Sequence, residues 1–173
     1  MLNPYEHDDA DVLAANVEAI IEPLAALIDH AHRAGGELVY VNDNYGDFAA
    51  TRDDLVARAS EGRRPDLVEP IVPREGTAFL PKVRHSAFYS TTLEYLLQQR
   101  GVKEVVLVGQ VTEQCILYSA LDAYVRHYSV CVPTDAVAPI DRDLGDAALR
   151  MMERNMRAAL VETAELIDRS AMA

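Results

Sequence analysis

The stretch EVVLVGQVTEQCILYSALDAYVRHYSVCVPT, residues 104–134, decides the fold. It begins with an apolar run, Glu104 to Gly109, without apolar/polar alternation, which is typical of a strand covered on both faces in a parallel sheet. From Thr112, the expected N-cap, apolar residues recur at helical spacing. Ser129 to Val132 returns as a second apolar strand. The stretch therefore predicts a βαβ unit of about 30 residues, a motif that is almost always right-handed.

The predicted helix places a cysteine, Cys115, in its first turn. Unpaired N–H groups and the positive end of the helix dipole favour a thiolate there and can hold an oxyanion. A free cysteine is also among the most buried residue types and often only packs in the core. Position alone therefore leaves catalysis and packing about equally open. The apolar face of this helix is expected to be buried, and it consists of Ile116, Leu117, Ala120, Leu121, Tyr124 and Val125.

Helices and apolar strands alternate along the rest of the chain. This order predicts one α/β domain over residues 1–173, with a mostly parallel sheet and helices on both faces, in three layers. Residues 42–46 are expected to form a turn at the rim of a pocket, and residues 61–76 a mobile or oligomer-contacting loop with at most one helical turn. The expected helices lie at 11–20, 23–34, 51–60, 91–100, 141–157 and from 163, and the expected strands at 37–41, 77–80 and 159–161.

Composition excludes several classes of partner. The formal net charge is -12 and the pI is about 4.7, which argues against nucleic acid and anionic membranes. No apolar run approaches the length of a membrane span, and the acidic start is unlike a signal peptide. Two cysteines, Cys115 and Cys131, suit a reducing compartment. We therefore expect a cytoplasmic protein that acts on a small molecule.

Two motifs carry a resemblance to a known family. Gly109 to Cys115 (GQVTEQC), followed by Ser119 to Ala123 (SALDA), resembles the pattern G-x-x-T-[DE]-x-C…A-x-D-A. Lys82 to Phe88 (KVRHSAF) resembles K-x-x-x-S-A-F. In these motifs, their order and their separation, the chain is similar to the isochorismatase-like cysteine hydrolases. The resemblance implies an α/β hydrolase of a small amide, carbamoyl or imide, working through a covalent thioester, without a cofactor and as a homo-oligomer.

The resemblance also implies roles for individual residues. Cys115 would be the nucleophile and Lys82 a cation beside it, while the backbone N–H groups of Val111 and Cys115 would meet the oxyanion, after a cis peptide between Gln110 and Val111. Gln110, Asn44 and His85 are expected to contact the substrate. For Asn44 a plain polar turn, and for His85 a structural histidine, are the competing interpretations.

One departure from the family concerns its aspartate base, which ends the family's first strand. Met1-Leu2-Asn3-Pro4-Tyr5 resembles the residues just after that aspartate, so we expect the strand and its aspartate to be absent from this sequence. A start codon assigned too far downstream is the simplest hypothesis. Asp8, Asp9 and Asp43 are conceivable substitutes, although their spacing recommends none of them.

Histidine positions give no metal motif. The D-x-H cluster of the family's nicotinamidases is missing, and His30 and His32 lie two apart on a helix, on different faces. We therefore expect no metal and no nicotinamidase activity. Two alternatives to the amidohydrolase remain: an isochorismatase-type vinyl-ether hydrolase, which needs no cysteine, and a non-catalytic scaffold or oligomerisation module of the same fold.

Overall fold

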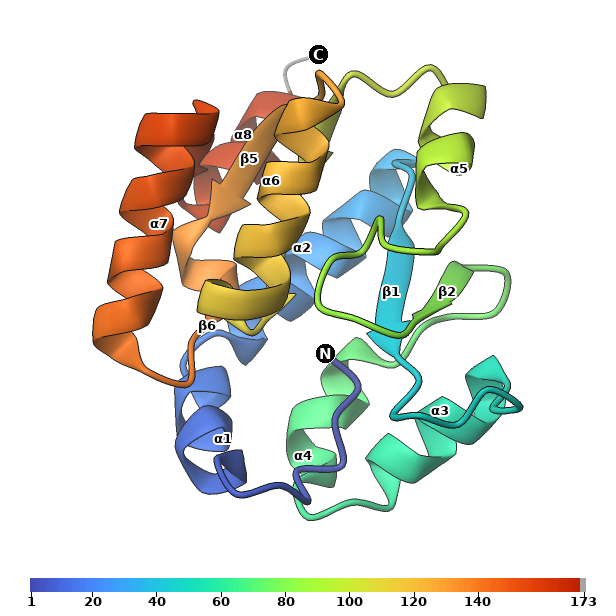
Figure 1. Cartoon of the computed structure of the whole chain (residues 1–173). Coiled ribbons are helices and arrows are strands. Elements are labelled where there is room, and N and C mark those ends of the chain that lie inside the picture. Colours follow the sequence, from blue (N-terminus) through green and yellow to red (C-terminus); the bar gives the residue numbers. More distant parts are fainter. Residues whose placement is uncertain (172–173) are drawn as a thin grey trace.

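The computed structural model describes residues 1–171, and the strands within them pair in parallel (Figure 1). The predicted α/β class is confirmed, although the strands fall into three small sheets, β1-β2, β3-β5-β7 and β4-β6. The strands are β1 (Val39–Asp43), β2 (Ala78–Lys82), β3 (Glu104–Val106), β4 (Gly109–Gln110), β5 (Ser129–Pro133), β6 (Val137–Ala138) and β7 (Ala159–Val161).

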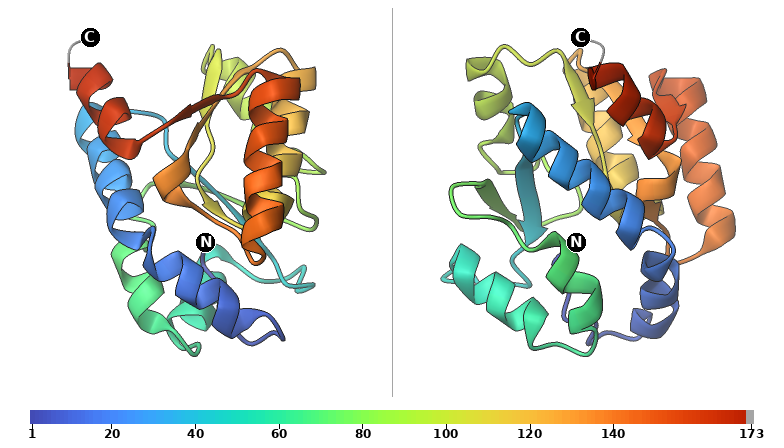
Figure 2. Two further views of the ribbon diagram at one scale, coloured as in Figure 1. Left: turned by 90° about the vertical axis from the view of Figure 1, so that its left-hand side faces the viewer. Right: turned by 180° about the vertical axis from the view of Figure 1, so that it is seen from behind.

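Helices cover both sides of these strands, and together they make three layers (Figure 2). One core cluster joins α1 and α2 to Val111, Ala136 and Ala138, and the other joins α5, α6 and α7 to β5. The helices are α1 (Ala10–Glu18), α2 (Ile21–Ala34), α3 (Arg52–Ser60), α4 (Pro65–Val68), α5 (Leu93–Gln99), α6 (Leu117–Val125), α7 (Arg142–Met156) and α8 (Thr163–Ala171), with a π-helical turn at Thr112–Ile116 and 3-10 turns at Glu69–Ile71 and Thr134–Ala136.

Local sequence explains where several helices begin and end. Thr51 caps α3 in a capping box with Asp54, and Asp141 caps α7 by accepting from the Leu144 N–H. Gly35 ends α2 in the left-handed conformation that glycine adopts without strain. Within the described residues, no helix is both long and apolar enough to cross a membrane.

Two expectations about burial were wrong. The first strand of the βαβ unit ends at Val106, which is 43% exposed, because β3 is an outer strand of its sheet and, among the described strands, pairs with β5 alone. On α6, Leu121, Tyr124 and Val125 are exposed. The reason is that α6 packs on β5 and α7 through a narrower surface, which includes Ser119, Ala120 and Ala123.

Most boundaries differ from expectation by a few residues, and two of the differences change an interpretation. The strand predicted at 37–41 lies at Val39–Asp43, so Asn42 and Asp43 belong to β1 and not to the turn after it. The loop predicted at 61–76 contains α4 and a 3-10 turn, and its Leu67, Val68 and Ile71 are buried in the core. Apolar anchoring of this kind ties the segment to the helices around it.

Candidate active site

The ends of β1 and β2 bring together a carboxylate and an ammonium group. Asp43 and Lys82 are the last residues of these parallel neighbours, and they pair in register. Lys82 Nζ lies 3.0 Å from Asp43 Oδ2, and the other oxygen of Asp43 accepts from the Tyr45 N–H at 3.0 Å. The Lys82 side chain is only 6% exposed, whereas that of Asp43 is 39% exposed. The result is a fixed ion pair with the lysine held inside the protein.

The cysteine lies where β4 turns into α6. The peptide between Gln110 and Val111 is cis, as predicted. A π-helical turn follows, in which the Ile116 N–H donates to the Val111 carbonyl at 3.1 Å, and it carries partly exposed Cys115. Isolated π-helical turns occur frequently at functional sites.

Thr112 is not the N-cap of this helix. The cap position belongs to Val111 and has no side-chain hydrogen bond, while the buried hydroxyl of Thr112 has no hydrogen-bond partner within residues 1–171. The π-helical geometry displaces the start of α6 to Leu117, so a capping rule based on a regular first turn does not apply.

Two titratable side chains of the described residues contact the Cys115 sulfur. Lys82 Nζ is 3.6 Å from Sγ, and His85 Nδ1 is 3.8 Å from it. His85 is exposed, and its ring lies 5.6 Å from that of Tyr118. The sulfur therefore has a buried cation on one side and an imidazole on the exposed side.

Residues of the S-A-F motif attach the segment that carries Lys82 and His85 to α6 through hydrogen bonds and packing. The Ser86 hydroxyl donates to Asp122, and the Ala87 N–H donates to the Ser119 hydroxyl at 2.9 Å. Phe88 is buried in the same cluster as α6. These contacts hold the two sequence motifs in one arrangement, which sets the distances around the sulfur.

The other predicted residues lie close to this cluster in different ways. Asn44 lines a hollow beside Asp43, and its side-chain oxygen accepts from the Gly46 N–H. The Gln110 side chain points to the N-terminal segment, where its oxygen accepts from Tyr5 Oη at 3.3 Å. Burial raises the pKa of the Tyr5 hydroxyl to about 12. A buried phenol of the N-terminal segment thus holds the Gln110 side chain beside the cis peptide.

Sequence reasoning left Asp43 as one of three carboxylates and did not single out Arg84. The other two, Asp8 and Asp9, are exposed in the segment just before α1. Arg84 lines a hollow of about 420 Å³ with Asp43 and Asn44, alongside Tyr45, Gly46, Phe48, Val83 and Tyr89. The signal for Asp43 was its place at a strand end, but the register that aligns it with Lys82 cannot be read from sequence.

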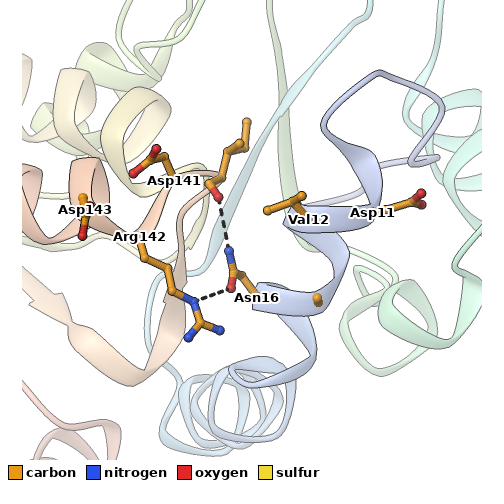
Figure 3. A pocket seen from close by; sticks show the side chains of 8 residues that line it. Asp11, Val12, Asn16, Asp141, Arg142 and Asp143 are labelled. Atoms are coloured by element: carbon orange, nitrogen blue, oxygen red, sulfur yellow. Dashed lines mark hydrogen bonds between the residues drawn. The ribbon is translucent and has the colours of Figure 1, made fainter.

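A second hollow, of about 660 Å³, lies between α1 and the start of α7 (Figure 3). Its central polar side chain, Asn16, donates to the Pro139 carbonyl at 2.9 Å and accepts from Arg142 Nε at 3.0 Å. Neither cysteine lines it. Among residues 1–171, no group of three or more histidine, cysteine, aspartate or glutamate side chains is placed to hold a metal ion.

The fold and this cluster define the class of protein: an α/β protein in which a lysine at the end of one parallel strand contacts a cysteine on the turn after another. The isochorismatase domain model matches residues 8–165, and the chain belongs to the isochorismatase family. It is 32% identical to the isochorismatase family protein YaaI of Bacillus subtilis over 169 residues, which are 98% of this chain and 93% of the relative.

Two other relatives have names that state an activity. The chain is 30% identical to a maleamate amidohydrolase of Pseudomonas putida over 153 residues, which cover 84% of this chain and 72% of the relative. It also resembles the crystal structure of N-carbamoylsarcosine amidase from Thermoplasma acidophilum, with a TM-score of 0.69 and 29% identity, over 86% of this chain and 85% of that one.

Proposed function

We propose that this protein is a cysteine-dependent amidohydrolase that cleaves a C–N bond of a small amide, carbamoyl or imide substrate. The observation that carries the proposal is the position of Cys115 Sγ, 3.6 Å from the buried Lys82 ammonium and on the turn from β4 into α6. A nearby ammonium favours the thiolate, which is the nucleophilic form of cysteine. Two relatives, named for maleamate and for N-carbamoylsarcosine, support the reaction class.

Each charged group has a distinct part in the proposed reaction. Lys82 stabilises the thiolate, and Asp43 holds the ammonium in place because both of its oxygens already accept hydrogen bonds. His85 contacts the sulfur directly from the exposed side, so it is the group that accepts the thiol proton and returns it to the leaving nitrogen. We assign His85 this role over Asp43, because the two oxygens of Asp43 are engaged with Lys82 and with the Tyr45 N–H.

The reaction then has two balanced halves. The Cys115 thiolate attacks the carbonyl carbon, the C–N bond breaks, and the amine leaves with the proton held by His85. Water then gives a proton to His85 and adds to the thioester carbonyl, the C–S bond breaks, and the acid leaves, which restores the Cys115 thiolate beside protonated His85. We assign the developing oxyanion to the backbone N–H groups of Val111 and Cys115, and the wall of the substrate site to Asn44.

Replacement of the sulfur tests the proposal. We expect Cys115→Ala to lower ammonia release from a panel of primary amides, N-carbamoyl amino acids and cyclic imides at least about 1,000-fold, with unchanged circular dichroism. Hydroxylamine added to the wild type during turnover should capture the acyl group as a hydroxamate. Cys131→Ser is the matched control, because Cys131 is buried in β5 and not in the site.

Two results would contradict the cysteine mechanism. Wild-type amide turnover by Cys115→Ala would show that the reaction does not need the sulfur. Cleavage of a vinyl ether by both the wild type and Cys115→Ala, with no amide cleaved by either, would instead support the vinyl-ether hydrolase. A folded wild-type protein that cleaves neither class would leave the scaffold interpretation.

A further inference from the structure

We propose that Tyr118 is a positioning residue whose ring holds the His85 imidazole beside the Cys115 sulfur. The inference rests on the proposed function, in which His85 accepts the thiol proton. Tyr118 is the second residue of α6, and its ring centroid lies 5.6 Å from that of His85, with an angle of 38° between the ring planes. Aromatic rings attract one another at centroid distances of about 4.5–7 Å, so the two rings are in contact.

The His85 side chain has few other restraints. His85 is exposed, and an exposed side chain moves between rotamers on a fast timescale. Its hydrogen-bond partner among the described residues is the Cys115 sulfur, 3.8 Å from Nδ1. Because a sulfur atom is a weak hydrogen-bond partner, this contact alone restrains the ring little. The contact with Tyr118 keeps Nδ1 within reach of the sulfur.

The backbone beside His85 is fixed in a way that its ring is not. The Ala87 N–H donates to the Ser119 hydroxyl at 2.9 Å, and the Ser86 hydroxyl donates to Asp122. These hydrogen bonds determine where the His85 Cα lies, but they leave the two side-chain torsions of the imidazole free. Tyr118 therefore acts on the part of His85 that the S-A-F motif does not hold.

Helix geometry places Tyr118 on the side of the sulfur. Cys115 and Tyr118 are three residues apart where the π-helical turn runs into α6, and residues at this spacing on a helix are neighbours on one face. The imidazole contacts both of them. Tyr118 is 45% exposed and belongs to neither of the two larger core clusters of the described residues, so packing of the core does not explain its position.

A double-mutant cycle between Tyr118 and His85 tests the proposal, with the amide that the wild type cleaves best as substrate. Tyr118→Leu should lower kcat about two- to tenfold, with little change in KM, which is the factor that an aromatic contact of this kind contributes. Tyr118→Phe keeps the ring and should retain wild-type kcat. In the His85→Ala background, Tyr118→Leu should lower kcat no further, because the group that Tyr118 positions is gone.

The matched control is a second exposed tyrosine of the same helix. Tyr124 is 39% exposed and lies six residues further along α6, about 9 Å along the helix axis, so Tyr124→Leu should keep wild-type kcat. An equal loss of kcat in Tyr118→Leu with and without His85 would mean that Tyr118 acts independently of the imidazole. That result would overturn the positioning role, as would wild-type kcat in Tyr118→Leu.

Alkylation of the sulfur separates this inference from the proposed reaction. Iodoacetamide reacts with the thiolate, and in the Cys131→Ser background the mass of the intact protein records the modification of Cys115. At pH 7, Tyr118→Leu should slow this alkylation about two- to tenfold, and it should slow it no further when His85 is alanine. This pattern without cleavage of any amide would uphold the positioning role and overturn the amidohydrolase. Amide cleavage that needs Cys115 and His85, and that is as fast in Tyr118→Leu as in the wild type, would overturn the positioning role and leave the amidohydrolase standing.

Discussion

Two hollows of the molecule, one between α1 and α7 and one beside Asp43, differ in what their polar side chains contact. The hollow between α1 and α7 is larger, about 660 Å³ against about 420 Å³. However, the side-chain amide of Asn16 at its centre donates a hydrogen bond to the Pro139 carbonyl and accepts one from Arg142. The smaller hollow is lined by Asp43, whose ion-pair partner Lys82 contacts the Cys115 sulfur. The connection to the cysteine, and not volume, distinguishes the candidate site.

The two regions also differ in the free-energy cost of burying their charged side chains. Lys82 is buried at 6% exposure, and removing an ammonium group from water is expensive even when a carboxylate accompanies it. The ion pairs on the surface, such as Arg63 with Asp11 beside the larger hollow, carry little cost and contribute little stability. A buried lysine that is directed at a sulfur atom is thus explained better by the reaction than by folding.

The largest effect that would sharpen the comparison is the loss of the buried ammonium. Lys82 Nζ is the cation 3.6 Å from Cys115 Sγ, so its removal takes away the charge beside the proposed nucleophile. We expect Lys82→Met to lower kcat about 100-fold or more, measured as ammonia release. The chain's other lysine, exposed Lys103, supplies the matched control, and Lys103→Met should retain wild-type activity. Wild-type kcat in Lys82→Met would mean that the ion pair serves only the fold.

A smaller effect is expected in the other hollow, and it should appear in stability alone. Asn16→Ala leaves the Pro139 carbonyl without its donor, so the free energy of unfolding should fall by about 1–3 kcal/mol. Chemical denaturation measures this change. Asp11→Ala, which removes an exposed ion pair at the same hollow, should cost less than about 1 kcal/mol.

Both variants at this hollow should keep wild-type kcat/KM below their unfolding transitions. If Asn16→Ala retained full stability and lost activity, the larger hollow would have to be a ligand site, and the contrast between the two hollows would fail.

The sequence predicted the parts of the site that depend on local pattern. A strand that turns into a helix and carries Cys115 follows from the change of period along the chain, and the resemblance placed Lys82 beside it. Asp43 could not be chosen over Asp8 or Asp9, because its contact depends on the register between β1 and β2. Strand register is a property of the paired sheet and is not visible in either strand alone.

Burial was harder to predict than element type. Helical spacing assigned Leu121, Tyr124 and Val125 to an apolar face, but the face that is covered depends on which elements pack against it. Thr112 was a sound N-cap by residue type, and the π-helical turn removed the geometry that a cap requires. Each error arises where tertiary packing overrides a local preference.

The smallest effect concerns Tyr5, the buried phenol that donates to Gln110. Tyr5 is 1% exposed, and burial raises the pKa of its hydroxyl from 10.0 to about 12. Between these values the unfolded chain loses the Tyr5 proton and the folded chain keeps it, so stability falls as pH rises from 10 to 12. By pH 11 the loss from this group is about 1 kcal/mol.

Tyr5→Phe should therefore show a shallower decline in the free energy of unfolding between pH 9 and pH 11, measured by urea denaturation beside the wild type. Its stability at pH 8 should be lower by about 1 kcal/mol or less, because the hydrogen bond to Gln110 is lost. Activity at pH 8 should be unchanged if Tyr5 only supports Gln110. Identical pH profiles of the free energy of unfolding in the two proteins would mean that the phenol ionises as easily in the folded chain as in the unfolded one. A lower kcat of Tyr5→Phe at pH 8 would mean that Tyr5 takes part in the reaction.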